Sequence, residues 1–472
     1  MKDEATKNNK VVTFGCRLNS YESEAIKKAV ENSAESNLVV FNSCAVTSAA
    51  ERDLRSAIRK ARKENPLAKI VVTGCAAQID PQKYAKMTEV DLVLGNVEKS
   101  KAESYEAIGK GSNPFAFDGE KRGQTPLGLD PAEARDDIAH KDRIFYEAKK
   151  SSAGFLSIEE SAKIKVNDIM SVRDTAPQLV SYFENKTRAF LEIQNGCNHR
   201  CTFCIIPFGR GNSRSVAFGE IVAQVKKMVA FGHKEVVLTG VDISSYGEDL
   251  VIKITLSQMI KRLLALVPEL LRLRLSSIDV AEIDEDFFEL LKTEPRLMPY
   301  LHLSLQSGDD MILKRMKRRH NRAQVLQFCA KARQIRPEMT FGADIIAGFP
   351  TENDEMFENS LRLISEVGII FNHIFPYSKR EATPAAKMPQ VNGKIIKQRA
   401  KLLRQAGELE LEKFLKKQVG KNIKVIVEKD GIARAENFLE VKIISKENLK
   451  AGELLEVKIL KVEENFLIGE LW

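Results

Sequence analysis

The sequence predicts an α/β protein in three parts: an N-terminal parallel α/β sheet domain, a central partial (β/α)6 barrel and a small C-terminal β-barrel. Residues 1–110 alternate short β-branched runs with helical patterns, and residues 188–412 repeat a strand–helix unit six times. Residues 413–472 hold several short alternating segments. A chain of 472 residues with 43 % hydrophobic residues is long enough for about three such domains.

The charge and the cysteine usage limit the class of protein. The start, Met1-Lys2-Asp3-Glu4, is charged, and no run approaches the roughly 18 apolar residues that cross a bilayer. We therefore expect a cytoplasmic protein with no membrane partner, in which the seven cysteines are reduced and are either core residues or ligands. The net charge of +8 is compatible with a polyanionic partner but does not require one.

In the N-terminal domain, three β-branched runs each end in a cysteine. The runs are Val11–Cys16, Leu38–Cys44 and Lys69–Cys75, with helical patterns at Tyr21–Asn32 and Ser48–Lys63. Because the carboxyl ends of parallel strands meet at one edge of a sheet, we expect the three cysteines to converge there. A single free cysteine is usually a small buried hydrophobe, but three in equivalent positions favour a set of ligands.

The middle segment, residues 111–187, is expected to be a linker or insertion, since such a long connection without strong periodicity is unusual within one domain. Helices are possible over Ala132–Lys149 and Ile158–Val172. The sequence does not indicate what this segment does.

The central domain contains six apolar runs separated by amphipathic stretches, which predicts a parallel barrel with its site at the carboxyl ends of the strands. The strands are expected at Ala189–Gln194, Glu235–Thr239, Leu271–Ser276, Leu301–Leu305, Thr340–Ile346 and Ile369–Phe375. Helices are expected at Glu220–Phe231, Ile254–Val267, Arg322–Arg336 and Asp354–Val367.

Cys197, Cys201 and Cys204 directly follow the first of these strands and bring three thiolates onto one short loop. This spacing indicates a metal or cluster site. Four thiolates close an iron–sulfur cluster, whereas three leave one iron with an open position where a small molecule can bind. An open position favours chemistry over a structural role.

Other strand ends carry small or polar residues, among them Gly240, Ser277 and Gln306. Such residues can approach the ribose, amino and carboxylate groups of a ligand, although a turn or cap role is open for each. The basic run Lys314–His320, with Arg210 near another strand end, is either a solvated face or a contact for a phosphate-bearing substrate. Cys329 lies in a helical pattern and is expected in the core.

After a helical pattern at Lys394–Lys417, the C-terminal segment reads as a small β-barrel. Strands are expected at Ile423–Glu428, Leu439–Ile444, Leu455–Lys461 and Phe466–Leu471. Barrels of this size often bind nucleic acid, and a stability module is the alternative.

With its Phe203, the pattern Cys197-x-x-x-Cys201-x-x-Cys204 resembles the signature of radical S-adenosylmethionine (SAM) enzymes. The following Ile205–Gly211 looks like the methylthiotransferase branch of that family. The elements Phe14–Asn19, Asn42–Thr47 and Val72–Cys75 are similar to the first domain of that branch, and the tail is similar to its TRAM domain.

This resemblance implies two [4Fe–4S] clusters and SAM as cofactors. One cluster would be held by Cys197, Cys201 and Cys204, and its open iron would chelate a SAM that is cleaved to a 5′-deoxyadenosyl radical. The other would be held by Cys16, Cys44 and Cys75 and would carry or donate sulfur, while a second SAM supplies the methyl group. Gly240, Ser277 and Gln306 are the candidates for contacts with SAM.

The stretches Phe14–Glu22 and Phe375–Pro384 look most like the group that modifies C2 of N6-threonylcarbamoyladenosine at position 37 of tRNA. The implied partners are the tRNA anticodon loop, an electron donor and a sulfur source. Two substrates remain as alternatives: N6-isopentenyladenosine in tRNA and an aspartate of a ribosomal protein. An alternative of another class is a non-catalytic zinc-containing tRNA-binding protein, although structural zinc normally takes four ligands.

Overall fold

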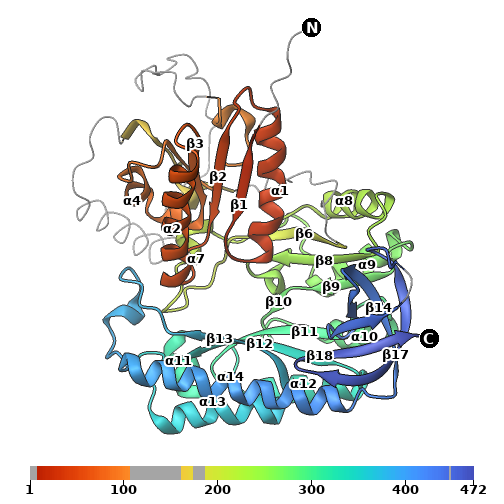
Figure 1. Cartoon of the computed structure of the whole chain (residues 1–472). Coiled ribbons are helices and arrows are strands. Elements are labelled where there is room, and N and C mark those ends of the chain that lie inside the picture. Colours follow the sequence, from red (N-terminus) through yellow and green to blue (C-terminus); the bar gives the residue numbers. More distant parts are fainter. Residues whose placement is uncertain (1–7, 107–160, 174–186, 446–447) are drawn as a thin grey trace. The chain divides into compact units, whose positions relative to one another are not determined.

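The structure, a computed structural model, describes residues 8–106, 161–173, 187–445 and 448–472 (Figure 1). The chain divides into two compact units. The first consists of Met1–Val12, Ile26–Ser43 and Glu51–Asn167, and the second of Thr13–Ala25, Cys44–Ala50 and Asp168–Trp472. The second unit therefore contains, besides the central and C-terminal parts, two short N-terminal segments, which include Cys16 and Cys44.

The N-terminal sheet has the strand order β1-β2-β3-β4-β5, and the pairs from β2 to β5 are parallel. Its strands are β1 (Lys10–Thr13), β2 (Leu38–Ser43), β3 (Lys69–Gly74), β4 (Leu92–Leu94) and β5 (Ile164–Lys165). Its helices are α1 (Arg17–Asn32), α2 (Ser48–Glu64), α3 (Cys75–Ile79), α4 (Pro81–Ala85) and the 3-10 helix η1 (Ala102–Ser104). Every residue of β2 is buried, as is typical of an inner strand of a parallel sheet. The predicted β-α-β pattern is confirmed.

Part of the middle segment belongs to this sheet. The helix expected over Ile158–Val172 is wrong from Ile164 onward, where β5 and the 3-10 helix η2 (Ile169–Ser171) stand instead. The amides of Val93 and Gly95 donate to carbonyls on either side of Ile164, so pairing with β4 overrides the local helical pattern. The helix expected over Ala132–Lys149 lies outside the described residues.

Six parallel strand positions form the central part, which confirms the predicted partial barrel. The strands are β6 (Arg188–Asn195), β7 (Arg214–Ser215), β8 (Glu235–Gly240), β9 (Arg272–Leu275), β10 (Ser277–Ile278), β11 (Tyr300–Gln306), β12 (Thr340–Ala347) and β13 (Ile369–Pro376). Only Ser276 separates β9 from β10, so the two occupy one strand position. The short β7 is antiparallel to β6.

The helices of this part are α7 (Ile206–Arg210), α8 (Phe218–Ala230), α9 (Leu256–Leu266), α10 (Glu285–Thr293), α11 (Asp310–Met316), α12 (Arg322–Ile335), α13 (Asp354–Val367) and α14 (Gly393–Lys416), with the 3-10 helices η3 (Ile243–Ser245) and η4 (Pro384–Lys387). The longer helices pack on the outer side of the strands, whereas α7 lies at the cavity, which two of its residues line. Figure 1 shows α12, α13 and α14 beside β11 to β13. Among the described residues, we find no helix with the length and apolar character to span a membrane.

The alternation of side chains along β11 explains how core and site share one strand. Leu301, Leu303 and Leu305 are buried in the hydrophobic core, whereas Ser304 and Gln306 line a cavity inside the barrel. Successive residues of a strand point to opposite faces, so one face of β11 packs on helices and the other faces the cavity. Cys329 on α12 is 2 % exposed within the same core, as predicted.

The C-terminal segment forms a closed barrel in the order β14-β15-β16-β18-β17. Its strands are β14 (Asn422–Lys429), β15 (Ile432–Ala435), β16 (Glu440–Ile444), β17 (Leu454–Glu463) and β18 (Phe466–Leu471). The four expected strands are confirmed. The strand β15 could not be predicted from the sequence, because its four residues include only one β-branched side chain.

The loop after β15 seals the barrel of parallel strands at their amino-terminal end. Phe438 adopts a positive φ of 73° and stacks on Tyr300, the first residue of β11, at 4.5 Å between ring centres. Beside it, the Thr340 hydroxyl at the start of β12 donates to the Asn437 carbonyl at 2.6 Å. Any site open to a ligand therefore lies at or above the middle of the barrel, toward the carboxyl ends of the strands.

Candidate active site

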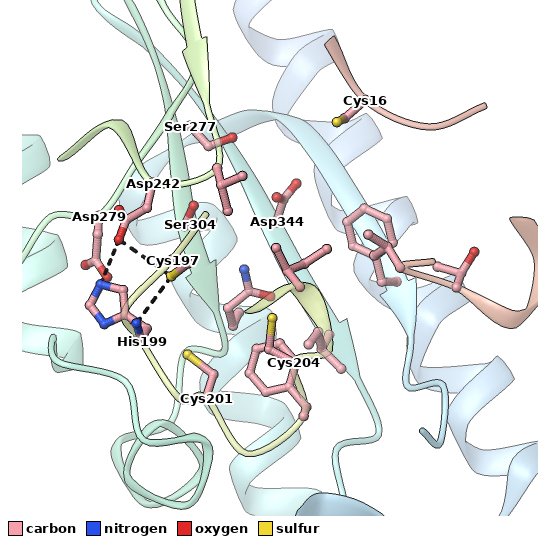
Figure 2. A pocket seen from close by; sticks show the side chains of 18 of the residues that line it. Cys16, Cys197, His199, Cys201, Cys204, Asp242, Ser277, Asp279, Ser304 and Asp344 are labelled. Atoms are coloured by element: carbon pink, nitrogen blue, oxygen red, sulfur yellow. Dashed lines mark hydrogen bonds and ion pairs between the residues drawn. The ribbon is translucent and has the colours of Figure 1, made fainter. Parts of the chain in front are cut away.

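A cavity of about 350 Å³ lies at the carboxyl ends of the strands, and all of its lining residues belong to the second unit. The three-cysteine loop forms one wall, the ends of β8 to β13 form another, and Cys16 with its neighbours completes it (Figure 2). A cavity therefore lies where the sequence predicts the site, at the carboxyl ends of the strands.

The backbone at the start of the cysteine loop requires a glycine. Gly196 has a φ of +73°, and a Cβ atom there would lie 1.9 Å from the carbonyl oxygen of Asn212. The amide of Cys197 donates to the carbonyl of Gly211 at 3.1 Å. Only glycine tolerates both this dihedral angle and this close approach, so the turn fixes where the first cysteine points.

Gln194, the last buried residue of β6, ties the loop to the end of β8. Its side-chain NH₂ donates to the Gly196 carbonyl at 2.7 Å and to the Ser213 hydroxyl at 2.8 Å. Its side-chain oxygen accepts from the amides of Val241 at 3.1 Å and Asp242 at 2.8 Å. A fully satisfied buried amide of this kind holds two strand ends in one arrangement.

The far end of the loop is held by α11 and by aromatic packing. The amide of Thr202 donates to the carbonyl of Met316 at 3.1 Å, and its hydroxyl donates to the carbonyl of Arg315 at 2.8 Å. Phe203 packs edge-on against Phe349, with 6.4 Å between ring centres. The side chain before the last cysteine thus anchors the loop in a small apolar cluster.

Hydrogen-bond donors and burial shape the surroundings of the three sulfurs. The backbone amide of His199 points at Cys197 Sγ at 3.4 Å, and Arg318 Nη1 lies 3.8 Å from Cys201 Sγ. Burial raises the pKa of the Cys204 thiol to about 12, and it also raises the pKa of Cys197. A cation that binds thiolates would displace these protons, and donors aimed at sulfur would then stabilise the negative charge.

The imidazole of His199 bridges two carboxylates at the rim of the cysteine loop. Its Nε2 lies 2.9 Å from Asp242 Oδ2 and 3.0 Å from Glu282 Oε1. The hydrogen bond to Asp242, followed by that to Glu282, raises the pKa of His199 to about 10. His199 is therefore a cation at neutral pH that joins the loop to the ends of two strands.

Arg318 joins the loop to the strand ends of the opposite wall. Its Nη2 donates to Asp279 Oδ2 and to the Ser304 carbonyl, both at 2.7 Å. Burial would raise the pKa of Asp279, but the hydrogen bond from His320 and the charge of Arg318 outweigh it and lower that pKa to about 2. The Asp279 carboxylate is thus ionised, and the positive charge of Arg318 balances it.

This geometry corrects the interpretation of the basic run. Lys314, Lys317 and Arg319 are exposed, as a solvated face requires. Arg318 and His320 instead turn inward and help to build the site. Periodicity alone could not reveal this, because their partner Asp279 stands about 40 residues away and is not marked by any motif.

Gly240, Ser277 and Gln306, the residues expected to contact SAM, all line the same cavity as the three-cysteine loop. A Cβ atom on Gly240 would lie 2.6 Å from the Gln194 carbonyl oxygen, so this strand end must be small. Gln306 has a positive φ of 69°, a strained conformation that is typical of residues held in place at functional sites. Their contact with SAM stays a prediction.

The second cysteine set is distributed over both units. Cys16 is exposed and lies across the cavity from the three-cysteine loop (Figure 2). In the same unit, Cys44 is buried beside Gly15, where a Cβ atom would come within 2.9 Å of its Sγ. Cys75 is in the first unit and directly follows Gly74, the residue paired in register with Ser43. Cys44 and Cys75 therefore follow paired strand ends, as predicted, while convergence of all three stays a prediction.

The role of Arg210 differs from the one that the sequence predicted. Arg210 on α7 was grouped with cations for a phosphate-bearing substrate, but it is 3 % exposed and pairs with Glu22 on α1. Its two Nη atoms lie 2.8 Å and 3.0 Å from the Glu22 carboxylate, and Nη2 lies 2.6 Å from Asn19 Oδ1. This buried pair ties the segment after Cys16 to the helix after Cys204.

Comparisons with known proteins agree with this architecture. The family model for the Radical SAM superfamily matches residues 191–364, and the model for the uncharacterized protein family UPF0004 matches residues 8–95. The threonylcarbamoyladenosine tRNA methylthiotransferase MtaB of Rickettsia prowazekii is 50 % identical over 97 % of this chain and 96 % of its own length.

Two further relatives extend the comparison. The protein of the same name from Aquifex aeolicus is 33 % identical over 95 % of this chain and 98 % of its own length. A tRNA-2-methylthio-N(6)-dimethylallyladenosine synthase of Rickettsia rickettsii is 28 % identical over 98 % of both chains. With its cysteine loop at the end of the first barrel strand and this full-length similarity, the chain belongs to the radical SAM methylthiotransferase family.

Proposed function

We propose that this enzyme adds a methylthio group to C2 of N6-threonylcarbamoyladenosine at position 37 of tRNA, beside the anticodon. The observation that carries the proposal is the 50 % identity over nearly the full length of a relative named for that nucleoside. The relative named for the dimethylallyl (isopentenyl) nucleoside is similar over the same length but at only 28 % identity. The non-catalytic zinc protein no longer has a basis, because the chain belongs to an enzyme family.

Membership of the radical SAM family implies SAM and a [4Fe–4S] cluster, and we assign Cys197, Cys201 and Cys204 as its ligands. Three thiols on one loop, with donors aimed at Cys197 and Cys201, suit a cluster with one open iron. When bound, the cluster supplies the electron that cleaves SAM to a carbon radical. Gly240, Ser277 and Gln306 would bind the SAM beside it.

We assign Cys16, Cys44 and Cys75 as ligands of a second [4Fe–4S] cluster that carries the sulfur. Cys16 lines the cavity, Cys44 lies beside Gly15, and Cys75 follows the neighbouring paired strand end. Three ligands again leave an open position, which suits a site that must hold and release a sulfur atom.

The chain's own residues would orient the reactants and exclude water. Leu18, Val46, Ile346 and Phe375 give the cavity apolar walls, which protect a reactive radical from side reactions. The partners we propose are tRNA, an electron donor and a sulfur source. The C-terminal barrel is the candidate for contacts with RNA outside the anticodon loop.

The test is nucleoside mass spectrometry of tRNA from cells with and without the gene. We expect the 2-methylthio form of N6-threonylcarbamoyladenosine to disappear without the gene, to return with the wild-type gene, and to stay absent with Cys201→Ala. An unchanged level of this nucleoside would refute the proposal. Loss of the 2-methylthio form of isopentenyladenosine, or of a methylthio group from a ribosomal protein, would identify one of the alternatives instead.

A further inference from the structure

Arg17 reaches into the barrel below the cavity. Its chain neighbours Cys16 and Leu18 both line the cavity. Its guanidinium carbon lies 5.6 Å from the ring centre of Phe438, which stacks on Tyr300 at the amino-terminal end of β11. The side chain therefore stands between the cavity and the aromatic seal of the barrel.

The charges around Phe438 are paired, with the exception of Arg17. Three other arginines have guanidinium carbons within 5.3 Å of this ring centre, and each of them binds a carboxylate. Arg188 and Arg434 pair with Glu428, and Arg274 pairs with Glu235. Within the part of the chain that the structure describes, no hydrogen bond or ion pair reaches the Arg17 side chain.

An unpaired cation in this position is costly. Arg17 is partly buried and shares the ring of Phe438 with the three other guanidinium groups, which carry the same charge. Glu235 and Asp344 attract it without a direct contact, and Asp344 is already bound by His302 and His373. A partly buried charge without a partner is unfavourable, so Arg17 is suited to bind an anion that reaches it.

The cations that line the cavity cannot take this role, because each already has a partner. His199 binds Asp242 and Glu282, Arg210 binds Glu22, and Arg318 binds Asp279. Arg17 itself does not line the cavity, but it stands between two residues that do, so it offers an unpaired cation to an anionic group that reaches past Cys16 and Leu18.

We propose that Arg17 binds the carboxylate of the threonylcarbamoyl group and thereby selects this nucleoside. The inference rests on the proposed function. The planar guanidinium matches a carboxylate with two parallel hydrogen bonds. A dimethylallyl group is apolar and would leave the arginine buried and unpaired, so the same residue would reject it.

The test compares anticodon stem–loop RNAs that differ only in one charge. One carries N6-threonylcarbamoyladenosine, a second carries its methyl ester, which keeps the shape but lacks the negative charge, and a third carries dimethylallyladenosine. Loss of a buried charge pair typically costs enough to lower kcat/KM about 100-fold. We expect Arg17→Gln to lower kcat/KM for the first RNA by about that factor and to change kcat/KM for the methyl ester by less than about threefold. Arg17→Lys keeps the positive charge and should restore part of the loss with the first RNA.

The control is Arg188→Gln, which removes an arginine from the same aromatic ring at a position that does not line the cavity. The ratio of kcat/KM for the acid to kcat/KM for the ester should be the same in this variant as in the wild type. Iron content and SAM cleavage without RNA report whether the clusters of each variant are intact. An equal loss with the acid and its ester would overturn the inference, because Arg17 would then act on the cluster bound at Cys16. A wild-type enzyme that modifies only the dimethylallyl RNA would instead overturn the proposed function.

Discussion

The two cysteine sets of this protein reach their positions in different ways. Cys197, Cys201 and Cys204 lie on one loop whose ends are held by Gln194 and Thr202. Cys16, Cys44 and Cys75 come from three strand ends and are divided between two units. The first set is therefore positioned by a local turn, and the second by tertiary structure.

This difference teaches where each site is vulnerable. If the proposed assignment holds, a change in the turn at Gly196 should affect one cluster only, since the loop carries all three of its proposed ligands. A change in the N-terminal segments should affect the other cluster and leave SAM cleavage intact. The strongest tests of the two-cluster assignment separate these two outcomes.

Replacing each set of three cysteines by alanine should give opposite losses. Two [4Fe–4S] clusters contain about eight irons, and each triple variant should retain about four. Loss of Cys197, Cys201 and Cys204 should reduce 5′-deoxyadenosine formation to background. Loss of Cys16, Cys44 and Cys75 should leave that cleavage but abolish methylthio transfer. Iron analysis, and chromatography of SAM products, measure both.

Cys329→Ala is the matched control for these variants, since it removes a cysteine that is buried in the core and should keep about eight irons per chain. If the triple variant of Cys16, Cys44 and Cys75 also kept eight irons, the second cluster would have to be abandoned.

Two glycine substitutions should affect one set each. Gly196→Ala places a Cβ atom 1.9 Å from a backbone carbonyl oxygen, and Gly15→Ala places one 2.7 Å from Cys44 Cβ, both at positive φ. Because backbone strain alone costs about 1–3 kcal/mol, each should lose most of the iron of its own site. Gly219→Ala, with no atom within 4 Å, should change neither.

The measurement is iron content together with SAM cleavage after identical reconstitution. Gly196→Ala should stop cleavage, and Gly15→Ala should leave it. A loss of cleavage with Gly15→Ala would contradict the division of labour between the two sets.

The same difference explains how much the sequence could predict. The spacing of Cys197, Cys201 and Cys204 predicts a site because the proposed ligands are neighbours in the chain. The positions of Cys44 and Cys75 could also be predicted, because a parallel sheet places the carboxyl ends of its strands at one edge whatever the details of packing. The barrel and the cavity at its carboxyl end followed from the repeated strand–helix pattern in the same way.

Pairs of charges that are distant in sequence could not be predicted. Arg210 and Glu22 are 188 residues apart, and Arg318 and Asp279 are 39 apart, so only the folded chain shows that they meet. From the sequence alone, a basic residue near a strand end is equally compatible with a contact to phosphate and with a buried ion pair. The strand β5 was missed for a related reason, because its pairing with β4 is not encoded locally.

Breaking the buried pair should loosen the link between the two sets. Glu22→Gln leaves Arg210 without its full counter-ion, and such a change typically costs about 3–5 kcal/mol in the free energy of unfolding. Glu22 lies on α1, which begins after Cys16, and Arg210 lies on α7, which follows Cys204. Without their pair we expect SAM cleavage to be less tightly coupled to sulfur transfer, so that more 5′-deoxyadenosine forms per methylthio group transferred. Urea unfolding and the ratio of the two products test this.

Glu410→Gln is the control, since its pair with Lys413 lies on the surface and is worth less than about 1 kcal/mol. An unchanged product ratio in Glu22→Gln, with stability lowered, would limit the pair to a purely structural role.

The smallest effect concerns Cys329, the cysteine outside both sets. Burial raises the pKa of its thiol to about 12 from the ordinary 9.0. Since the folded state disfavours the thiolate, its contribution to stability is constant below pH 9 and declines as the pH rises toward 12. At pH 8 this thiol is therefore protonated as well as buried, so iodoacetamide should modify Cys329 far more slowly than the exposed Cys16 in metal-free protein. Mass spectrometry of the alkylated peptides measures the two rates, and similar rates in the folded protein would contradict the assignment of Cys329 to the core.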